Sequence, residues 1–320
     1  MKKFVIILCS VSIFVFHGFT QNEVPGNVAT VASKPFSNSH FIIVDSISFH
    51  YRTWNDQLPA PKGKVLLIHG FIGSTFCWRE NIDPLINQGY EVVAVDLPGF
   101  GYSDRNLQVN QSQSNRSRLL WDFLTVIDQN DSSRWNIVGH SMGGGTAEAM
   151  SLMKPGRMKS LTIVDGMVFI RNRNVNSSFV LMTQMKGTNK VLVALTKKRM
   201  IDFDKLQHIL KGLYGYFPDS AVVEGYLRPL LLEGSAESIL NIFANAKEIQ
   251  HLHSDALSEL PVLVIWGKKD RTIRLHSGKK FKRSVPTVDL KIIPGARHSP
   301  METHSEIFNG YLLEFLNKNN

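Results

Sequence analysis

At residues 139–144 the chain reads GHSMGG, so Ser141 has one glycine two residues before it and another two residues after it. An apolar run, NIVG, ends at residue 139, and the helix-prone stretch MGGGTAEAMSLM follows at residues 142–153. This order predicts that Ser141 occupies a sharp turn between a strand and a helix. Glycines are needed there because side chains would collide with the neighbouring strand and helix. The helix N-terminus would also place its positive end where an oxyanion forms, so the pattern indicates a nucleophilic serine.

A serine nucleophile needs a base, and the base needs an acid that orients it. The apolar run VLVIW continues into GKKD, which places Asp270 in a loop at the end of a strand. The run LKIIP is followed by GARHSP, which places His298 in the next such loop. Because parallel strands bring these loops to one edge of a sheet, we predict that Ser141, His298 and Asp270 meet there as a catalytic triad.

Other polar residues near these motifs have simpler interpretations. Asp165 ends the run LTIVD and is therefore the alternative acid of the triad. His69 begins the stretch HGFIG and His140 lies within GHSMGG, and we expect both histidines to brace loops. Asp96 and Asp104 are expected to hold the loop between them. The remaining histidines share no spacing with carboxylates that would indicate a metal site, and no cofactor is implied.

The elements that must position the triad are short apolar runs rich in β-branched residues. They are VLLIH (65–69), VVAVD (92–96), NIVG (136–139), LTIVD (161–165), VLVIW (262–266) and LKIIP (290–294). The segment at 41–54 predicts two further strands joined by a tight turn. The near-continuous hydrophobicity is typical of a sheet covered on both faces. Since most gaps are long enough for a crossover helix, we predict an α/β fold with a mostly parallel central sheet flanked by helices.

The gap between LTIVD and VLVIW is much longer than one crossover needs. It is rich in Leu, Met, Phe, Tyr and Lys, with helical-looking stretches around residues 190–213 and 236–250. Because core strands resume after it, we predict an inserted helical cap over the ends of the strands. The expected division is a core at 41–170 and 256–320, with the cap at 171–255.

These motifs together resemble the α/β-hydrolase superfamily in its cap-bearing branch, over most of residues 41–317. The matching segments are HGFIGSTFCW, DLPGFGYSD, GHSMGG, GKKD and GARHSPMETHSE. The resemblance implies an α/β-hydrolase fold in which Ser141 is the nucleophile, Asp270 the acid and His298 the base. It further implies an oxyanion hole made by the backbone amides of Phe71 and Met142.

The resemblance also narrows the chemistry. Ser141 argues against the haloalkane dehalogenases and epoxide hydrolases, which use an aspartate nucleophile. Prolyl aminopeptidases usually carry Trp where Met142 stands, and carbon–carbon bond hydrolases often carry Asn where His140 stands. We therefore expect a serine hydrolase that cleaves small to medium carboxylic esters through an acyl-enzyme. A carbon–carbon or amide hydrolase with the same triad, and a non-enzymatic ligand-sensing relative, remain the alternatives.

The predicted cap would close a largely apolar pocket over the triad. Candidates for its lining are Phe179, Met182, Met185, Leu213 and Tyr216. The partner implied by this pocket is a small-molecule ester. The formal net charge of +9 at pH 7 raises the question of an anionic partner. Its basic residues are scattered, however, and tracts such as the one at 279–283 indicate a solvated helix face, so no nucleic-acid partner is expected.

The N-terminus carries a targeting pattern. Lys2 and Lys3 precede an apolar run at residues 4–16, which is short for a membrane span. We expect residues 1–20 to be a signal peptide and 21–40 a lead-in to the fold, so that the protein is secreted or periplasmic without stable membrane insertion. The alternative is an anchor formed by the uncleaved segment. Cleavage would leave Cys77 as the only cysteine, which excludes an intramolecular disulfide.

Overall fold

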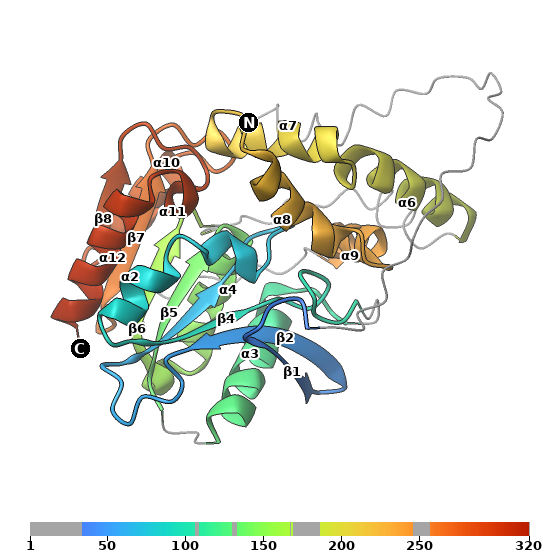
Figure 1. Cartoon of the computed structure of the whole chain (residues 1–320). Helices are drawn as coiled ribbons and strands as arrows, with labels where there is room; N and C mark the ends of the chain where they lie inside the picture. The colour runs from blue at the N-terminus through green and yellow to red at the C-terminus, as the bar shows by residue number, and fades with distance from the viewer. Residues whose placement is uncertain are drawn as a thin grey trace.

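The computed structural model describes residues 34–105, 109–129, 133–166, 168, 186–245 and 257–319. Within them, the centre of the molecule is an eight-stranded sheet with the order β1-β2-β4-β3-β5-β6-β7-β8 (Figure 1). The strands are β1 (Ser39–Val44), β2 (Ile47–Trp54), β3 (Lys64–Ile68), β4 (Glu91–Val95), β5 (Trp135–His140), β6 (Met158–Val164), β7 (Val262–Gly267) and β8 (Asp289–Ile293). The expected signal peptide and most of the lead-in lie outside the described residues.

The sheet is mostly parallel, as predicted. β1 and β2 form an antiparallel hairpin whose two turn residues, Asp45 and Ser46, both have positive φ (50° and 63°). Such a turn matches the natural twist of two paired strands. β2 is antiparallel to β4, and every later neighbour pair in the sheet is parallel. All residues of β5 and β7 are buried, which explains why these strands are continuous apolar runs.

Helices cover the sheet, and all but the last two of them lie between strands in the chain. They are α2 (Ile82–Asn87), α3 (Gln113–Asp128), α4 (Met142–Met153), α10 (His276–Ser284), α11 (Pro300–Thr303) and α12 (Ser305–Lys318), with short 3₁₀ helices η1 (Thr75–Trp78) and η2 (Pro155–Arg157). Helix α4 contacts β5 and β6 and packs against α3, whereas α12 contacts α2, β7 and β8. The helix after Ser141 therefore starts at the carboxyl end of β5, in the centre of the sheet.

Four helices lie between β6 and β7, in the segment where the sequence predicts a cap. They are α6 (Lys186–Met200), α7 (Phe203–Tyr214), α8 (Ser220–Leu230) and α9 (Ser235–Asn245), and are called the cap below. Figure 1 shows them beyond the ends of the central strands. The helical stretch expected around 190–213 is two helices, because the Asp202 side chain accepts from Lys205 N and starts α7 anew. Helix α8 has no counterpart in the sequence-based expectations.

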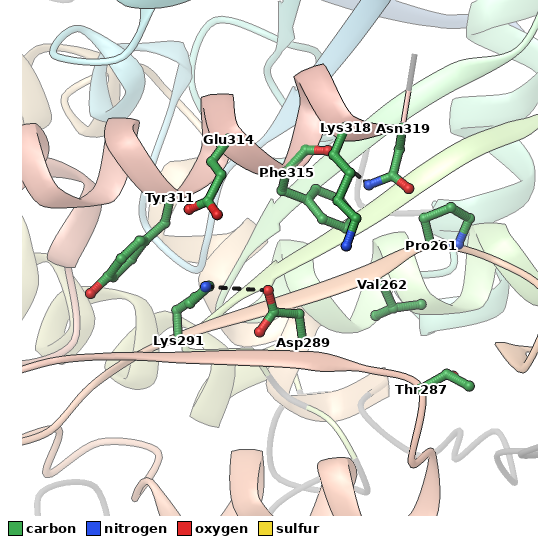
Figure 2. A pocket seen from close by; sticks show the side chains of 10 residues that line it. All are labelled: Pro261, Val262, Thr287, Asp289, Lys291, Tyr311, Glu314, Phe315, Lys318 and Asn319. Atoms are coloured by element: carbon green, nitrogen blue, oxygen red, sulfur yellow. Dashed lines mark hydrogen bonds and ion pairs between the residues drawn. The ribbon is translucent and has the colours of Figure 1, made fainter.

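The opposite ends of the strands carry a separate surface feature. A surface depression lies there, between the start of β8 and the last turns of α12 (Figure 2). Two of its charged side chains form an ion pair, with Lys291 Nζ 3.5 Å from Asp289 Oδ2. It holds none of the residues that the sequence singles out. Among the described residues, no helix has the length and apolarity that crossing a membrane requires.

Candidate active site

The backbone at Ser141 has the strained geometry of a sharp turn. Its φ of 52° and ψ of −115° are values that residues with a side chain rarely adopt. The Ser141 N–H donates to Val164 O at 2.9 Å, which fixes the turn against β6. A Cβ at Gly139 would lie 2.2 Å from Gly143 O, and one at Gly143 would lie 2.4 Å from Ile68 O. Both glycines are therefore required for the close approach of strand and helix.

The structure brings the three predicted triad residues together. His298 Nε2 lies 3.0 Å from Ser141 Oγ, and His298 Nδ1 lies 2.7 Å from Asp270 Oδ2. Ser141 is 7% exposed, His298 4% and Asp270 6%, so all three residues are buried but keep a small accessible surface. With Nδ1–H donating to Asp270, Nε2 faces the serine with the lone pair that a general base needs.

The loop after β7 orients the Asp270 carboxylate. Asp270 Oδ1 accepts hydrogen bonds from the backbone amides of Thr272 at 2.7 Å and Ile273 at 3.1 Å. This leaves Oδ2 for the imidazole of His298. Two amide donors on one oxygen hold the carboxylate in a single orientation.

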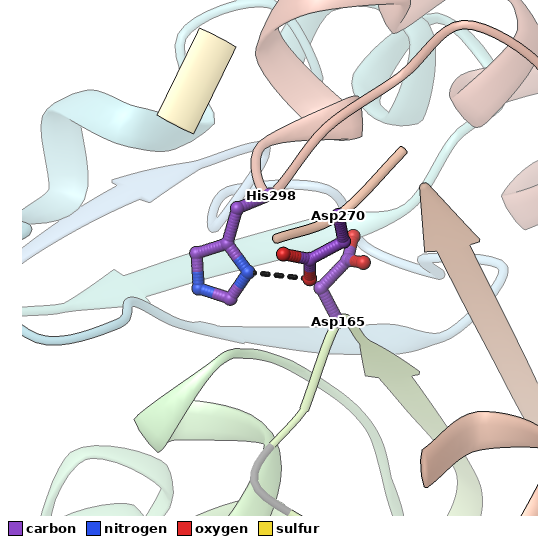
Figure 3. Close-up of side chains that lie close together, drawn as sticks. All are labelled: Asp165, Asp270 and His298. Carbon is purple, nitrogen blue, oxygen red and sulfur yellow. Dashed lines mark hydrogen bonds and ion pairs between the residues drawn. The ribbon is translucent and has the colours of Figure 1, made fainter. Parts of the chain in front are cut away.

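The alternative acid, Asp165, lies beside Asp270, but it is Asp270 that makes the hydrogen bond to the His298 imidazole (Figure 3). Asp165 Oδ1 accepts from Gly267 N at 3.0 Å. Burial and the negative charge of Asp270 raise the pKa of Asp165 well above its ordinary value. These causes favour the protonated form of Asp165. Of the two acids, only Asp270 is hydrogen-bonded to His298.

The same cluster contains metal-ligand atom types. Within the described chain, Asp165, Asp270 and His298 each offer one such atom, all within 4.8 Å of one another. The raised pKa of Asp165 disfavours the ionised form that a metal needs, and metal binding would compete with the bond between His298 and Asp270. The donor set is therefore better suited to a hydrogen-bonded triad than to an ion.

The two residues predicted to form the oxyanion hole lie next to the nucleophile. Met142 is the first residue of α4, and the first amides of a helix have no partner within it. Phe71 follows Gly70, where a Cβ would lie 3.0 Å from Ser141 Cβ. The loop after β3 is thus pressed against the nucleophile, and the next residue, Ile72, has a φ of 55°.

His69 and His140 brace loops, as expected from their positions. His140 Nε2 lies 2.7 Å from His298 O, and burial together with His298 lowers the pKa of His140 to about 3. His140 is therefore neutral and donates its Nε2–H to that carbonyl. His69 Nε2 accepts from Leu97 N at 2.9 Å while Nδ1–H donates to Gly70 O at 2.7 Å. Each histidine thus joins two loops around the triad.

Sequence reasoning missed a second serine–histidine–aspartate set. His50 Nδ1 lies 2.6 Å from Asp96 Oδ2, and His50 Nε2 lies 2.7 Å from Ser39 Oγ. All three residues have an exposure of 0%. Burial would raise the pKa of Asp96, but the charge and hydrogen bond of His50 outweigh it and leave the pKa lowered. The only hint in the sequence was Asp96 itself, at the end of β4.

Also missed was Glu302, four residues after His298. Its carboxylate is buried in α11 and accepts from Tyr214 and Tyr226 of the cap, at 2.6 and 2.7 Å, and from Arg79. The signal in the sequence was weak, because an acid in the short segment after a loop is usually exposed. Its partners come from three distant segments that no local pattern connects.

Comparison with known proteins places this geometry in a family. A family model described as the alpha/beta hydrolase fold matches residues 64–305. A 2-hydroxy-6-oxononadienedioate/2-hydroxy-6-oxononatrienedioate hydrolase of Burkholderia vietnamiensis is 30% identical over 90% of this chain and 99% of its own length. A crystal structure of a membrane phospholipase A shares the fold with a TM-score of 0.68 at 24% identity, over 88% of this chain and 86% of that one.

A second solved structure has the same fold. A putative lipase of Acinetobacter baumannii AYE superposes with a TM-score of 0.69 at 20% identity, over 88% of this chain and 91% of that one. The family match spans the strands that carry Ser141, Asp270 and His298, as well as the cap between them. The sheet order and the serine turn agree with it. This chain therefore belongs to the alpha/beta hydrolase family and is a hydrolase.

Proposed function

We propose that this hydrolase cleaves carboxylic esters of small to medium size through an acyl-enzyme on Ser141. The observation that carries the proposal is the 3.0 Å distance between Ser141 Oγ and His298 Nε2, with Asp270 bonded to the other ring nitrogen. Such an arrangement activates a hydroxyl for attack on a carbonyl carbon.

In the first half of the reaction, Ser141 Oγ attacks the ester carbonyl while His298 Nε2 takes the hydroxyl proton. The carbonyl oxygen becomes an oxyanion, which the amides of Phe71 and Met142 stabilise. The imidazolium, held by Asp270, then gives its proton to the leaving alcohol as the carbon–oxygen bond breaks. Each oxyanion donor is worth about 10²- to 10³-fold in kcat in related chemistry.

In the second half, water replaces the alcohol. His298 takes a proton from the water, which attacks the acyl carbon and forms a second oxyanion in the same hole. Collapse of this intermediate releases the carboxylic acid and returns the proton to Ser141 Oγ. The net reaction consumes one water and yields one acid and one alcohol, with no cofactor.

The cap residues expected to line the pocket bear on the size of the substrate. Leu213 is half-buried at the end of α7 and its backbone touches the His298 loop, which supports a place near the pocket. Tyr216 is 52% exposed, so its ring is not enclosed within a pocket. The other expected lining residues, Phe179, Met182 and Met185, lie outside the described residues. Each buried methylene of the acyl group would add at most about 0.8 kcal/mol of binding until the pocket is full.

The relatives favour a second candidate, hydrolysis of a carbon–carbon bond. The substrates in the relative's name are dicarboxylates. An enzyme that binds such a substrate needs cationic side chains near the triad to pair with its carboxylates. Two arginines at the contact between cap and core are already engaged, Arg79 by Glu302 and Arg105 by carbonyl groups. Arg171 and Arg173 lie outside the described residues. The engaged arginines, together with His140 at the Asn position, support the ester over the dioate.

One assay separates these functions. The wild type and Ser141→Ala are given p-nitrophenyl esters of two to twelve carbons, and separately 2-hydroxy-6-oxononadienedioate. We expect ester turnover that peaks at about two to eight carbons and that Ser141→Ala abolishes. Turnover of the dioate alone would establish the second candidate. Saturable binding without turnover of either would indicate a ligand-sensing protein. A jump in rate on emulsified long-chain triacylglycerol would contradict the size limit.

We further propose that the protein is exported, with residues 1–20 removed. The support is the pair Lys2 and Lys3 before the apolar run at residues 4–16. N-terminal sequencing of the protein from the periplasm or medium should give a start near Gln21. An intact Met1 recovered in the membrane fraction would favour an anchor.

A further inference from the structure

Two polar clusters join the cap to the core in the part of the chain that the structure describes. The Arg105 cluster comprises Arg105 and its acceptors: the side chain donates to Ser235 Oγ at 2.8 Å and to Pro229 O at 2.7 Å in the cap. The same guanidinium donates to Gly101 O at 2.6 Å and Ser103 O at 2.9 Å in the core. None of these hydrogen bonds involves a residue of the triad.

The Glu302 cluster comprises Glu302, Arg79, Tyr214 and Tyr226. Glu302 Oε2 accepts from the Tyr214 hydroxyl at 2.6 Å and from the Arg79 guanidinium, while Oε1 accepts from the Tyr226 hydroxyl at 2.7 Å. The Glu302 side chain is 0% exposed. A buried carboxylate with three donors is rigid, because removing any donor leaves part of its charge unpaired.

This cluster fixes the last turn of α7, and the last turn touches the catalytic base. Tyr214 is the last residue of α7, and the carbonyl of its neighbour Leu213 accepts from His298 N–H at 3.0 Å. Carbonyls in the last turn of a helix have no partner within it, so this one is available to another segment. On the other side, His298 O accepts from His140 Nε2–H at 2.7 Å.

The backbone of His298 is thus held from two sides, by the cap at its N–H and by the core at its C=O. We propose that Glu302 is a positioning residue for His298, because it anchors Tyr214 and thereby the Leu213 carbonyl that holds the base. The position of the last turn of α7 is then coupled to the geometry of the triad. This inference rests on the proposed role of His298 as the base of hydrolysis.

The expected size of the effect follows from the geometry. Catalytic groups must stay within about 0.5 Å of their productive positions, and a misplacement of about 1 Å costs on the order of 100-fold in rate. Glu302→Gln, which removes the charge and one acceptor, should lower kcat about 10- to 100-fold. Tyr214→Phe, which removes one hydroxyl, should lower kcat several-fold with little change in KM.

The test compares these variants with a control in the other cluster. Arg105→Lys breaks several contacts between cap and core without touching the loop of His298. For each variant we measure kcat and KM on the preferred p-nitrophenyl ester, the rate of fluorophosphonate labelling of Ser141, and the melting temperature. Hydrogen exchange in the peptide that contains His298 reports directly on the bond to Leu213.

The proposal predicts that kcat and the labelling rate fall together in Glu302→Gln and Tyr214→Phe, with faster exchange at His298. Arg105→Lys should leave kcat and that exchange unchanged even if its melting temperature falls. Unchanged kcat in folded Tyr214→Phe and Glu302→Gln, or an equal loss in Arg105→Lys, overturns the proposal. Absence of turnover and labelling in the wild type would instead refute the ester hydrolase. In that case the exchange at His298 still decides whether Glu302 holds this loop.

Discussion

Two serine–histidine–aspartate sets occur in this chain with similar hydrogen-bond lengths. In the triad, the histidine lies 2.7 Å from Asp270 and 3.0 Å from Ser141. In the second set, the corresponding distances are 2.6 Å to Asp96 and 2.7 Å to Ser39. Residue types and distances alone therefore do not separate a catalytic set from a structural one.

The difference lies in the backbone around each serine. Ser141 occupies the strained turn before α4, where helix amides converge and the side chain keeps a small exposure of 7%. Ser39 begins the edge strand β1 and is 0% exposed, and its Oγ also accepts from Phe36 N at 3.1 Å. A substrate carbonyl has no access to Ser39. A nucleophile needs access and oxyanion donors as much as it needs a base.

The second set has a structural role that supports the first. Asp96 Oδ1 accepts from Thr75 N at 2.6 Å, and Asp96 Oδ2 accepts from Tyr102 N at 2.8 Å. The carboxylate therefore ties the loop after β3, which contains Phe71, to the loop after β4. We infer that His50 and Ser39 keep this carboxylate in place, so that one set catalyses and the other holds the scaffold.

The largest expected difference between the two sets is in the serines. Ser141→Ala should lower kcat by about 10⁶-fold, because the nucleophile is lost. Ser39→Ala should leave kcat within a few-fold of the wild type. Steady-state rates and fluorophosphonate labelling check both variants. Labelling that persists in Ser141→Ala, or that disappears in folded Ser39→Ala, would reverse the assignment of the two sets.

Substitution of the two neighbouring acids, Asp270 and Asp165, should give the second-largest difference in kcat. Asp270→Asn should lower kcat about 10⁴-fold, because the imidazole loses the partner that sets its tautomer. Asp165→Asn should cost far less, since Asp165 accepts a hydrogen bond from Gly267 N and makes none with His298. The two variants are compared at pH 7 with the same ester. A larger loss in Asp165→Asn would show that the hydrogen bond to Asp270 is not the catalytic one.

Asp96→Asn tests the structural set. Asn at this position sets an amide N–H₂ group against buried N–H donors, and a buried donor left without its acceptor costs about 1–3 kcal/mol. We expect a loss of this size in urea unfolding, with a smaller fall in kcat from a loosened loop at Phe71. Asp104→Asn is the control, because Asp104 contacts the neighbouring strand through its backbone N–H to Ser48 O. Equal losses in both variants would contradict a special role for Asp96.

The sequence was sufficient for the triad but not for the second set. Asp270 and His298 follow apolar strands, so parallel pairing alone brings them to one edge of the sheet. Ser39 and His50 lie on the two strands of a hairpin, and no strand-end rule directs them toward Asp96. Their pairing depends on the register of β1 and β2 and on the place of β4 beside β2. Both features are set by the tertiary structure and leave no local pattern in the sequence.

The contacts of the cap were unpredictable for a similar reason. The apolar composition between β6 and β7 predicted helices, but the positions of α6–α9 over the core depend on side chains from distant segments. Glu302 and Arg105 each bond to residues more than 70 positions away in the chain. Periodicity reports on which face of a helix is buried, and not on what covers it.

The prediction that bears least on activity concerns stability at low pH, where His140, beside the triad, and Asp96, in the second set, should titrate in different pH ranges. Burial and His298 lower the pKa of His140 from 6.5 to about 3 in the folded protein. As the pH falls below about 6.5, the unfolded chain therefore takes up a proton that the folded chain refuses. Stability is lost over this interval, by at most about 1.4 kcal/mol per pH unit for one proton.

Asp96 acts in a lower range. Its pKa is below the ordinary 3.8 in the folded protein, so its stabilisation is present above that value and is lost only as the pH falls through the folded pKa. His140→Asn removes a titrating group, and should flatten the stability curve between about pH 6.5 and 4 while leaving the lower part unchanged. Urea unfolding at half-unit steps from pH 7.5 to 3 measures both parts. Because His69 is also buried with a lowered pKa, a residual slope should persist in the variant. A curve that His140→Asn does not flatten would mean that His140 already carries its proton in the fold, and could not then serve as the neutral brace of His298.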